Sequence, residues 1–245
     1  MRAWFCRWAL AWWLNGCEVA GMLKKTRPQH GLVLGRTGSG KSELVKTALR
    51  AGRLGNRLLV IDTEDEYDAA GVPELVPEIS IDQAVVVARE GAQTFAWRFV
   101  VDPDSPDIDD VFRLAMAVRD CTVLAEEVAD YKHALWYRRA LVRGRKRGVR
   151  VLSMSQRPYE VNRTVSSQSA FVVAFYSDEP RDLEYVKHRF GAAAEAELRT
   201  LDPARYVCCV WGEMDLFYEL LHPRNGNRCS ETVGPTPTHP KGETP

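Results

Sequence analysis

Short apolar runs alternate with longer amphipathic segments along most of the chain. The apolar runs predict β-strands at residues 31–35, 59–62, 94–101, 121–125, 148–155 and 170–176. Helical spacing of apolar residues between them predicts helices at 43–50, 81–89, 111–119, 131–145, 178–190 and 192–200. Two later runs, 206–211 and 216–221, predict a hairpin that turns at Gly212 and Glu213. This alternation predicts an α/β fold, in which helices flank a mostly parallel central sheet.

The two ends of the chain differ from this pattern. Residues 1–21 hold four of the seven tryptophans, and their apolar stretch is interrupted by Arg7 and too short to span a bilayer. We interpret them as an extension upstream of a domain that starts at Met22; a membrane-contacting helix is the second interpretation. Residues 223–245 are rich in proline and poor in large apolar residues, so we expect a disordered tail. The predicted domain is therefore 22–222.

Composition and charge narrow the possible partners. The chain has 245 residues, of which 45% are hydrophobic and 27% are charged, as in ordinary globular proteins. Its 33 basic and 33 acidic residues cancel, so any contact with nucleic acid requires a local basic patch. The six cysteines form no C-x-x-C pair, which favours neither a zinc site nor a disulfide framework and is typical of a reducing compartment.

The first predicted strand runs into a phosphate-binding loop. Residues 35–42 read Gly-Arg-Thr-Gly-Ser-Gly-Lys-Ser and lie between a predicted strand and a predicted helix, which is the context that a P-loop requires. The glycines allow main-chain N–H groups to surround phosphates. Lys41 is predicted to contact the β- and γ-phosphates of ATP, and the Ser42 hydroxyl to ligate Mg²⁺. The predicted ATP-binding residues are Gly35, Arg36, Thr37, Gly38, Ser39, Gly40, Lys41 and Ser42.

Two adjacent carboxylates follow a later strand. The apolar run 121–125 ends in Glu126 and Glu127, the position of the acidic pair in a Walker B strand. We predict that Glu126 holds Mg²⁺ and that Glu127 polarises the attacking water. The first position is usually aspartate, so here a longer side chain must reach the same ion. The second carboxylate favours an ATPase that activates water over a GTPase or a small-molecule kinase.

An arginine-rich segment and the strand after it carry a family resemblance. Gly144-Arg145-Lys146-Arg147-Gly148, an apolar strand and then Ser155-Gln156-Arg157-Pro158 resemble the G-R-K-x-G…Q-R-P pattern of the FtsK–HerA superfamily of DNA-pumping ATPases. Residues 59–62, which end in Asp62, and the following Glu66-Tyr67 resemble its second strand. The resemblance runs from about residue 31 to residue 168.

The resemblance implies a fold and roles for two residues. It implies a RecA-like P-loop NTPase of the ASCE type, with the P-loop strand central in the sheet. Gln156 matches the polar sensor of the γ-phosphate, and Arg145 matches the arginine finger that a neighbouring subunit supplies. The site is then completed only in a homo-oligomeric ring, which the family implies is a hexamer. The other arginines of the segment, including Arg143 and Arg147, fit either a solvated helix face or contacts with DNA phosphates.

Size selects among the members of the superfamily. A motor of about 200 residues is similar to the genome-packaging ATPases of membrane-containing icosahedral viruses, which implies translocation of double-stranded DNA into a capsid. Expected partners are then this DNA and capsid-vertex or membrane proteins, and the expected locations are the host cytoplasm and the virion vertex. Lys132, Arg157 and Arg163 are candidates for the pore. The alternatives are a filamentous-phage-type ATPase that exports single-stranded DNA, and a non-motor P-loop phosphotransferase or nucleotide-binding module.

Overall fold

A computed structural model describes residues 29–50, 54–65, 67, 78–131, 134–202, 207–212 and 216–219. The predicted extension at 1–21, the predicted tail at 223–245 and the pore candidate Lys132 lie outside these residues. Glu213, in the predicted hairpin turn, also lies outside them.

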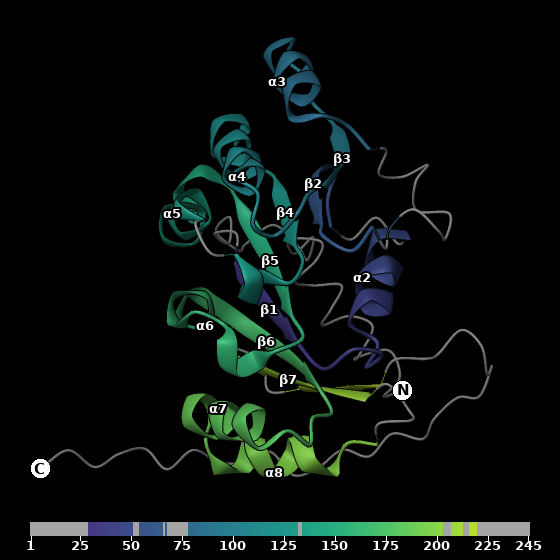
Figure 1. Cartoon of the computed structure of the whole chain (residues 1–245), viewed down its shortest axis with the longest axis vertical. Helices are drawn as coiled ribbons and strands as arrows, with labels where there is room; N and C mark the ends of the chain where they lie inside the picture. Colours follow the sequence, from purple (N-terminus) through teal and green to yellow (C-terminus); the bar gives the residue numbers. More distant parts are fainter. Residues whose placement is uncertain are drawn as a thin grey trace, which may run out of the picture.

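Eight strands form one sheet at the centre of the described structure (Figure 1). They are β1 (His30–Leu34), β2 (Arg57–Asp62), β3 (Phe95–Val100), β4 (Thr122–Ala125), β5 (Arg150–Ser155), β6 (Ser169–Phe175), β7 (Val207–Gly212) and β8 (Leu216–Glu219). Their spatial order is β3-β2-β4-β5-β1-β6-β7-β8. The first six in this order pair in parallel, whereas β7 and β8 each run antiparallel to the strand before them. The α/β fold with a mostly parallel sheet and a central P-loop strand is confirmed.

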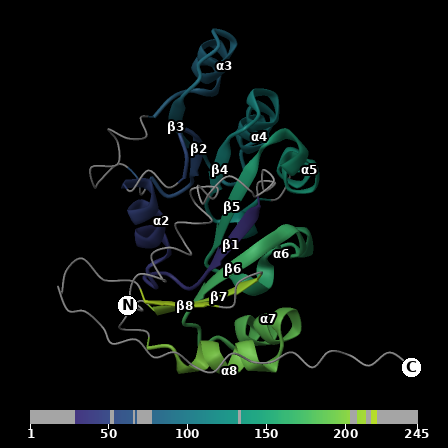
Figure 2. The ribbon, with the colours of Figure 1, turned by 180° about the vertical axis from the view of Figure 1, so that it is seen from behind.

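Helices cover the two faces of the sheet unequally. The helices are α2 (Lys41–Arg50), α3 (Ile81–Arg89), α4 (Asp107–Val118), α5 (Leu135–Arg143), α6 (Arg163–Gln168), α7 (Pro180–Phe190) and α8 (Ala192–Thr200). Among the described residues, α2 packs on one face and α4 to α8 pack on the other (Figures 1 and 2). The strands alternate accordingly, because successive side chains of a strand point to opposite faces. Leu32 and Leu34 of β1 join the core on the α4–α8 side, whereas Val33 packs beneath α2.

Two helix predictions had wrong bounds, and one short helix was not predicted. The helix expected over 131–145 begins at Leu135 and ends at Arg143, where a 3-10 turn (Gly144–Arg147) takes over. Gly148 ends that turn with φ of 75°, a conformation that disfavours a side chain. Helix α4 begins at Asp107, before the expected residue 111, because Pro106 suits a helix start and acidic residues stabilise the first turn. The short helix α6 was not predicted; its cap is Asn162, which accepts a hydrogen bond from the Thr164 N–H over 2.8 Å.

Candidate nucleotide-binding and hydrolysis site

The candidate site lies where three adjacent parallel strands end. Strand β1 leads into the P-loop, β5 leads into Gln156, and β4 leads into Glu126 and Glu127. The register pairs Leu34 with Ser155 across β1 and β5 and places β4 beside β5. Because the carboxyl ends of parallel strands meet at one edge of the sheet, the predicted P-loop, acidic pair and sensor are brought together there.

The P-loop has the conformation of a phosphate cradle. Gly38 and Gly40 have φ of 75° and 103°, a region that glycine adopts without strain, and α2 begins directly after them at Lys41. The Lys41 side chain is 6% exposed, and its ammonium group donates to the Gly35 and Arg36 carbonyls over 2.5 and 3.0 Å. A buried cation at a helix N-terminus fits the β- and γ-phosphates of ATP.

Glu127 has an unusual backbone conformation. Its φ and ψ of 39° and 53° are left-handed, which costs energy for a residue other than glycine. The carboxylate is 7% exposed and accepts hydrogen bonds from the Gln156 N–H at 3.0 and 3.2 Å and from the Ser155 hydroxyl at 3.2 Å. Burial raises the pKa of Glu127, and these hydrogen bonds and the nearby charge of Lys41 oppose that rise. A raised pKa suits a carboxylate that accepts a proton from water.

Glu126 contacts a different part of the chain. Its side chain is 5% exposed and accepts a hydrogen bond from the Tyr67 hydroxyl over 2.8 Å. Carboxylate and hydroxyl oxygens are ligand types that Mg²⁺ prefers, so Glu126 and Ser42 in the first turn of α2 fit the metal of a bound Mg–ATP. Because the chain turns at Glu127, the two glutamates at the end of β4 have different partners. Glu126 contacts Tyr67, and Glu127 contacts the end of β5.

Gln156 links the acidic pair to the P-loop. Its main chain donates to Glu127, and its side-chain oxygen accepts a hydrogen bond from the Thr37 hydroxyl. Arg36 ties the loop to the end of β6, with an ion pair to Asp178 at 3.2 Å and its guanidinium 5.2 Å from the Tyr176 ring. The Arg36 pair is exposed and contributes little to stability.

Arg145 lies at the other end of the parallel strands, before the amino end of the central strand β5. It precedes β5, whereas Gln156 follows that strand, so about 20 Å of strand separates them. The Arg145 guanidinium donates to Gln168 over 3.1 Å. Within one chain, Arg145 is therefore not part of the P-loop site.

The remaining predicted residues divide between structural and surface roles. Asp62 is fully buried and forms an ion pair with Arg98 at 3.2 Å, so it is part of the core. Arg157 is 53% exposed and pairs with Glu160 at 3.2 Å, and Arg163 is exposed. Within the described ranges, no helix is both long and apolar enough to cross a membrane.

Sequence reasoning missed Tyr67 and Ser155 as contacts of the two glutamates. Both belong to the motifs that carry the family resemblance: Tyr67 is the second residue of Glu66-Tyr67, and Ser155 directly precedes Gln156. Neither motif shows which carboxylate accepts a hydrogen bond from which hydroxyl, because this pairing depends on the order of the strands in the sheet.

The fold and the site define a P-loop NTPase of the RecA-like class. Residues 21–157 match the family described as the central domain of helicase HerA, and this match covers more than half of the chain. The chain belongs to that family, and its resemblance to the FtsK–HerA superfamily is confirmed.

Individual relatives agree with this assignment. Protein P9 of Pseudoalteromonas phage PM2 is 28% identical over 151 residues, a match that covers 58% of this chain and 66% of P9. The chain therefore spans just under two thirds of that relative's length. The genome packaging NTPase B204 from Sulfolobus turreted icosahedral virus 2, solved with ATP-gammaS, superimposes with a TM-score of 0.66 at 16% identity, covering 80% of this chain and 100% of B204. VirB4 of Thermoanaerobacter pseudethanolicus gives 0.56 at 12% identity, over 79% of this chain and 90% of VirB4. At these identities the structural matches show the fold.

Proposed function

We propose that this chain is an ATP-hydrolysing translocase that packages double-stranded viral DNA into a preformed capsid. The observation that carries the proposal is the buried Glu127, which the end of β5 holds near Lys41 at the P-loop edge of the sheet. This arrangement suits hydrolysis, because a buried carboxylate of raised pKa can take the proton of an attacking water. The description of B204 as a genome packaging NTPase supports the choice of process.

The predicted site residues divide the work of binding and hydrolysing ATP. Lys41 and the P-loop amides bind the phosphates, Ser42 and Glu126 hold Mg²⁺, and Gln156 contacts the γ-phosphate from the end of β5. ATP, when bound, supplies the phosphoanhydride bond whose cleavage drives the motor. Arg145 acts in the site of a neighbouring subunit of a homo-oligomeric ring, which we propose to be hexameric. The protein acts in the host cytoplasm and at the virion vertex, beside capsid or membrane proteins.

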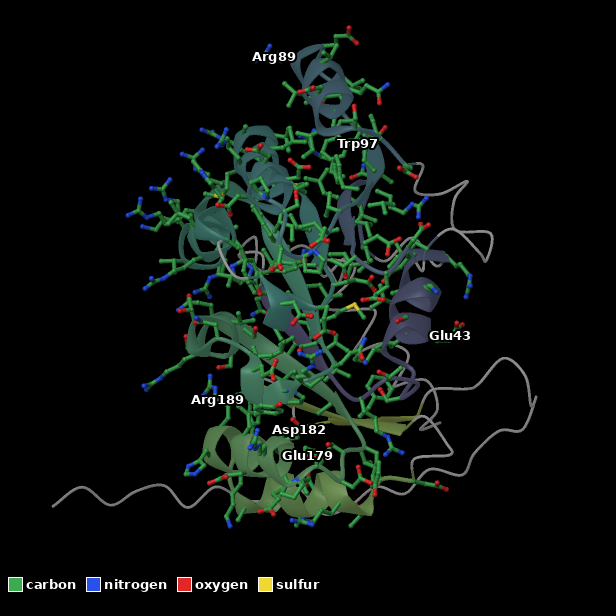
Figure 3. All side chains as sticks on the ribbon, in the orientation of Figure 1. Glu43, Arg89, Trp97, Glu179, Asp182 and Arg189 are labelled. Atoms are coloured by element: carbon green, nitrogen blue, oxygen red, sulfur yellow. The ribbon has the colours of Figure 1, made fainter. Side chains whose placement is uncertain are left out.

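A basic surface supports contact with a polyanion. Five cations of α5 and the following turn are exposed: Arg138, Arg139, Arg143, Lys146 and Arg147. No acidic residue occurs between Tyr131 and Tyr159, so the positive charge of this segment has no acidic neighbour in the sequence. Figure 3 shows nitrogen-tipped side chains projecting from the α4–α5 side of the molecule. Such a patch supplies, in a chain of zero net charge, the local attraction that DNA phosphates require.

The test is ATP turnover by the full chain with and without double-stranded DNA. We expect the wild type to be stimulated by duplex DNA. Glu127→Gln should bind ATP but turn it over about 10²–10⁴-fold more slowly, the range for removal of a general base. Lys41→Ala should lose ATP affinity, and Lys187→Ala, which changes an exposed lysine on α7, serves as the control.

Two results would contradict the proposal. ATP binding without turnover, indifferent to DNA, would indicate a nucleotide-binding module. Stimulation by single-stranded DNA alone would indicate an exporter of the filamentous-phage type.

A further inference from the structure

A continuous chain of hydrogen bonds leads from β3 to the carboxylate of Glu126. Arg98 on β3 donates to Asp62 Oδ2 over 3.2 Å, and the Tyr67 main-chain N–H donates to the same oxygen over 3.2 Å. The Tyr67 hydroxyl then donates to Glu126 Oε1 over 2.8 Å. Asp62 and Tyr67 are fully buried, and Arg98 and Glu126 are 4% and 5% exposed. Hydrogen bonds that are shielded from water in this way hold their partners firmly.

Tyr67 is held on both its main chain and its ring. The ring packs in the apolar cluster beneath α2, and the Lys46 ammonium group on that helix lies 5.3 Å from its centroid. Arg98 also pairs with Asp65 and, at 3.3 Å, with Glu78, so its guanidinium is held by three carboxylates. The tyrosine hydroxyl that contacts Glu126 therefore belongs to a residue whose ring and main-chain N–H both have partners in the core.

The hydrogen bond between Tyr67 and Glu126 is relevant to an unusual residue at the metal position. Glutamate stands at the metal position, where aspartate is usual, and its extra rotatable bond must be fixed before the carboxylate can bind an ion. A hydrogen bond from a rigid donor fixes that bond in advance, and a carboxylate has capacity for a metal ion beside one such donor.

We infer that Tyr67 is a positioning residue, whose hydroxyl holds the Glu126 carboxylate in the orientation that ligates the Mg²⁺ of Mg–ATP. The inference rests on the proposed function, because it takes the site to hold Mg²⁺ together with ATP. Asp62 and Arg98 act one step further away, by fixing the main chain of Tyr67.

The experiment measures the Mg²⁺ dependence of nucleotide binding by the full chain, with a fluorescent ATP analogue as the probe. Tyr67→Phe keeps the ring and removes the hydroxyl. We expect it to raise the half-saturating Mg²⁺ concentration about tenfold, as loss of a hydrogen bond to a charged group allows. Analogue affinity in EDTA should stay within about twofold of the wild type, because the P-loop is unchanged.

Tyr137→Phe is a matched control. It removes another buried tyrosine hydroxyl that makes a 2.8 Å hydrogen bond, in this case to Ser153. We expect this variant to keep the wild-type Mg²⁺ dependence. An unshifted Mg²⁺ dependence in Tyr67→Phe, an equal loss of its affinity in EDTA, or the same shift in Tyr137→Phe would each overturn the inference.

A double-mutant cycle tests the contact itself. In a Glu126→Asp background the shorter side chain no longer needs the tyrosine, so adding Tyr67→Phe should change the half-saturating Mg²⁺ by less than about twofold. A second tenfold shift would show that Tyr67 acts by another route. A purely structural role would move stability in both backgrounds alike and would not produce this non-additivity.

Failure of this inference can be told apart from failure of the proposed function. The titrations need neither hydrolysis nor DNA. A wild type that binds Mg–ATP but ignores duplex DNA contradicts the proposed function only. An unshifted Tyr67→Phe in a DNA-stimulated ATPase contradicts the role of Tyr67 only.

Discussion

His30 shows how one residue connects the fold to pH. It begins β1, is fully buried, and its Nδ1 accepts the Val151 N–H over 3.0 Å. Burial, together with the nearby charge of Arg145, lowers the pKa of His30 to about 4. The unfolded chain then takes up a proton from about pH 6.5 downward, whereas the folded chain does so only near pH 4.

Stability should therefore fall as the pH drops from about 6.5 to about 4, with His30 contributing roughly 3 kcal/mol of the loss. Urea unfolding at a series of pH values measures it. In His30→Asn the amide oxygen takes the place of Nδ1 and does not titrate, so its stability profile should be flatter over this range. The control is His188→Asn, since that side chain is 78% exposed. Parallel profiles for wild type and His30→Asn would contradict the account.

At the residue scale, the sequence predicts which residues belong to the candidate site better than it predicts which side chains they contact. The P-loop residues were predicted from a local motif, Glu126 and Glu127 from the end of an apolar strand, and Gln156 from the family resemblance. Tyr67 was not found as a contact of Glu126, because 59 positions separate them and only the pairing of β2 with β4 brings them together.

At the scale of elements, an acidic residue of one helix caps another. Asp109, in the first turn of α4, accepts hydrogen bonds from the first N–H groups of α5, those of Leu135, Trp136 and Tyr137, at 3.1, 2.8 and 3.4 Å. Its charge also opposes the positive end of the α5 dipole. Asp109 thus provides the capping that Ala134, at the N-cap position, does not.

Asp109→Ala should lower the free energy of unfolding by about 1–2 kcal/mol, the upper range for loss of an N-cap. Chemical denaturation measures the change. The neighbouring Asp110→Ala removes a surface ion pair with Arg113 and one acidic charge from the same first turn of α4, and it should cost less than about 1 kcal/mol. Equal losses in the two variants would show that Asp109 does not cap α5.

Local signals were predictable at this scale and tertiary ones were not. Ser80 directly precedes the predicted helix 81–89 and is a local cap signal, and the structure shows it in a capping box with Gln83, which lies three residues away. The acidic stretch 102–110 leads into α4 and is a local start signal for that helix, whereas its Asp109 also caps α5, 26 residues later. Local sequence patterns do not reveal that contact, because it joins residues of two different helices.

At the scale of the whole molecule, the proposed active-site residues lie at the two opposite ends of β5. The P-loop, the acidic pair and Gln156 lie at one edge of the sheet, and Arg145 lies at the other. A finger in this place can serve only the site of another copy. That geometry follows from the direction of β5 and was not visible in the 11-residue spacing of Arg145 and Gln156.

Mixing subunits tests this arrangement. Lys41→Ala and Arg145→Ala should each have little ATPase activity alone. Mixed before assembly, they should regain part of it, because Lys41→Ala subunits supply an intact Arg145 to neighbours with an intact P-loop. A mixture with no more activity than its components would contradict a role for Arg145 in trans.

The central claim is that ATP hydrolysis moves this protein along double-stranded DNA. Displacement of a third strand from a duplex that carries a short triplex measures such movement directly. We expect the wild type to displace the third strand with ATP and Mg²⁺, and Glu127→Gln to bind ATP without displacing it. Rapid ATP hydrolysis that leaves the triplex intact would contradict the claim.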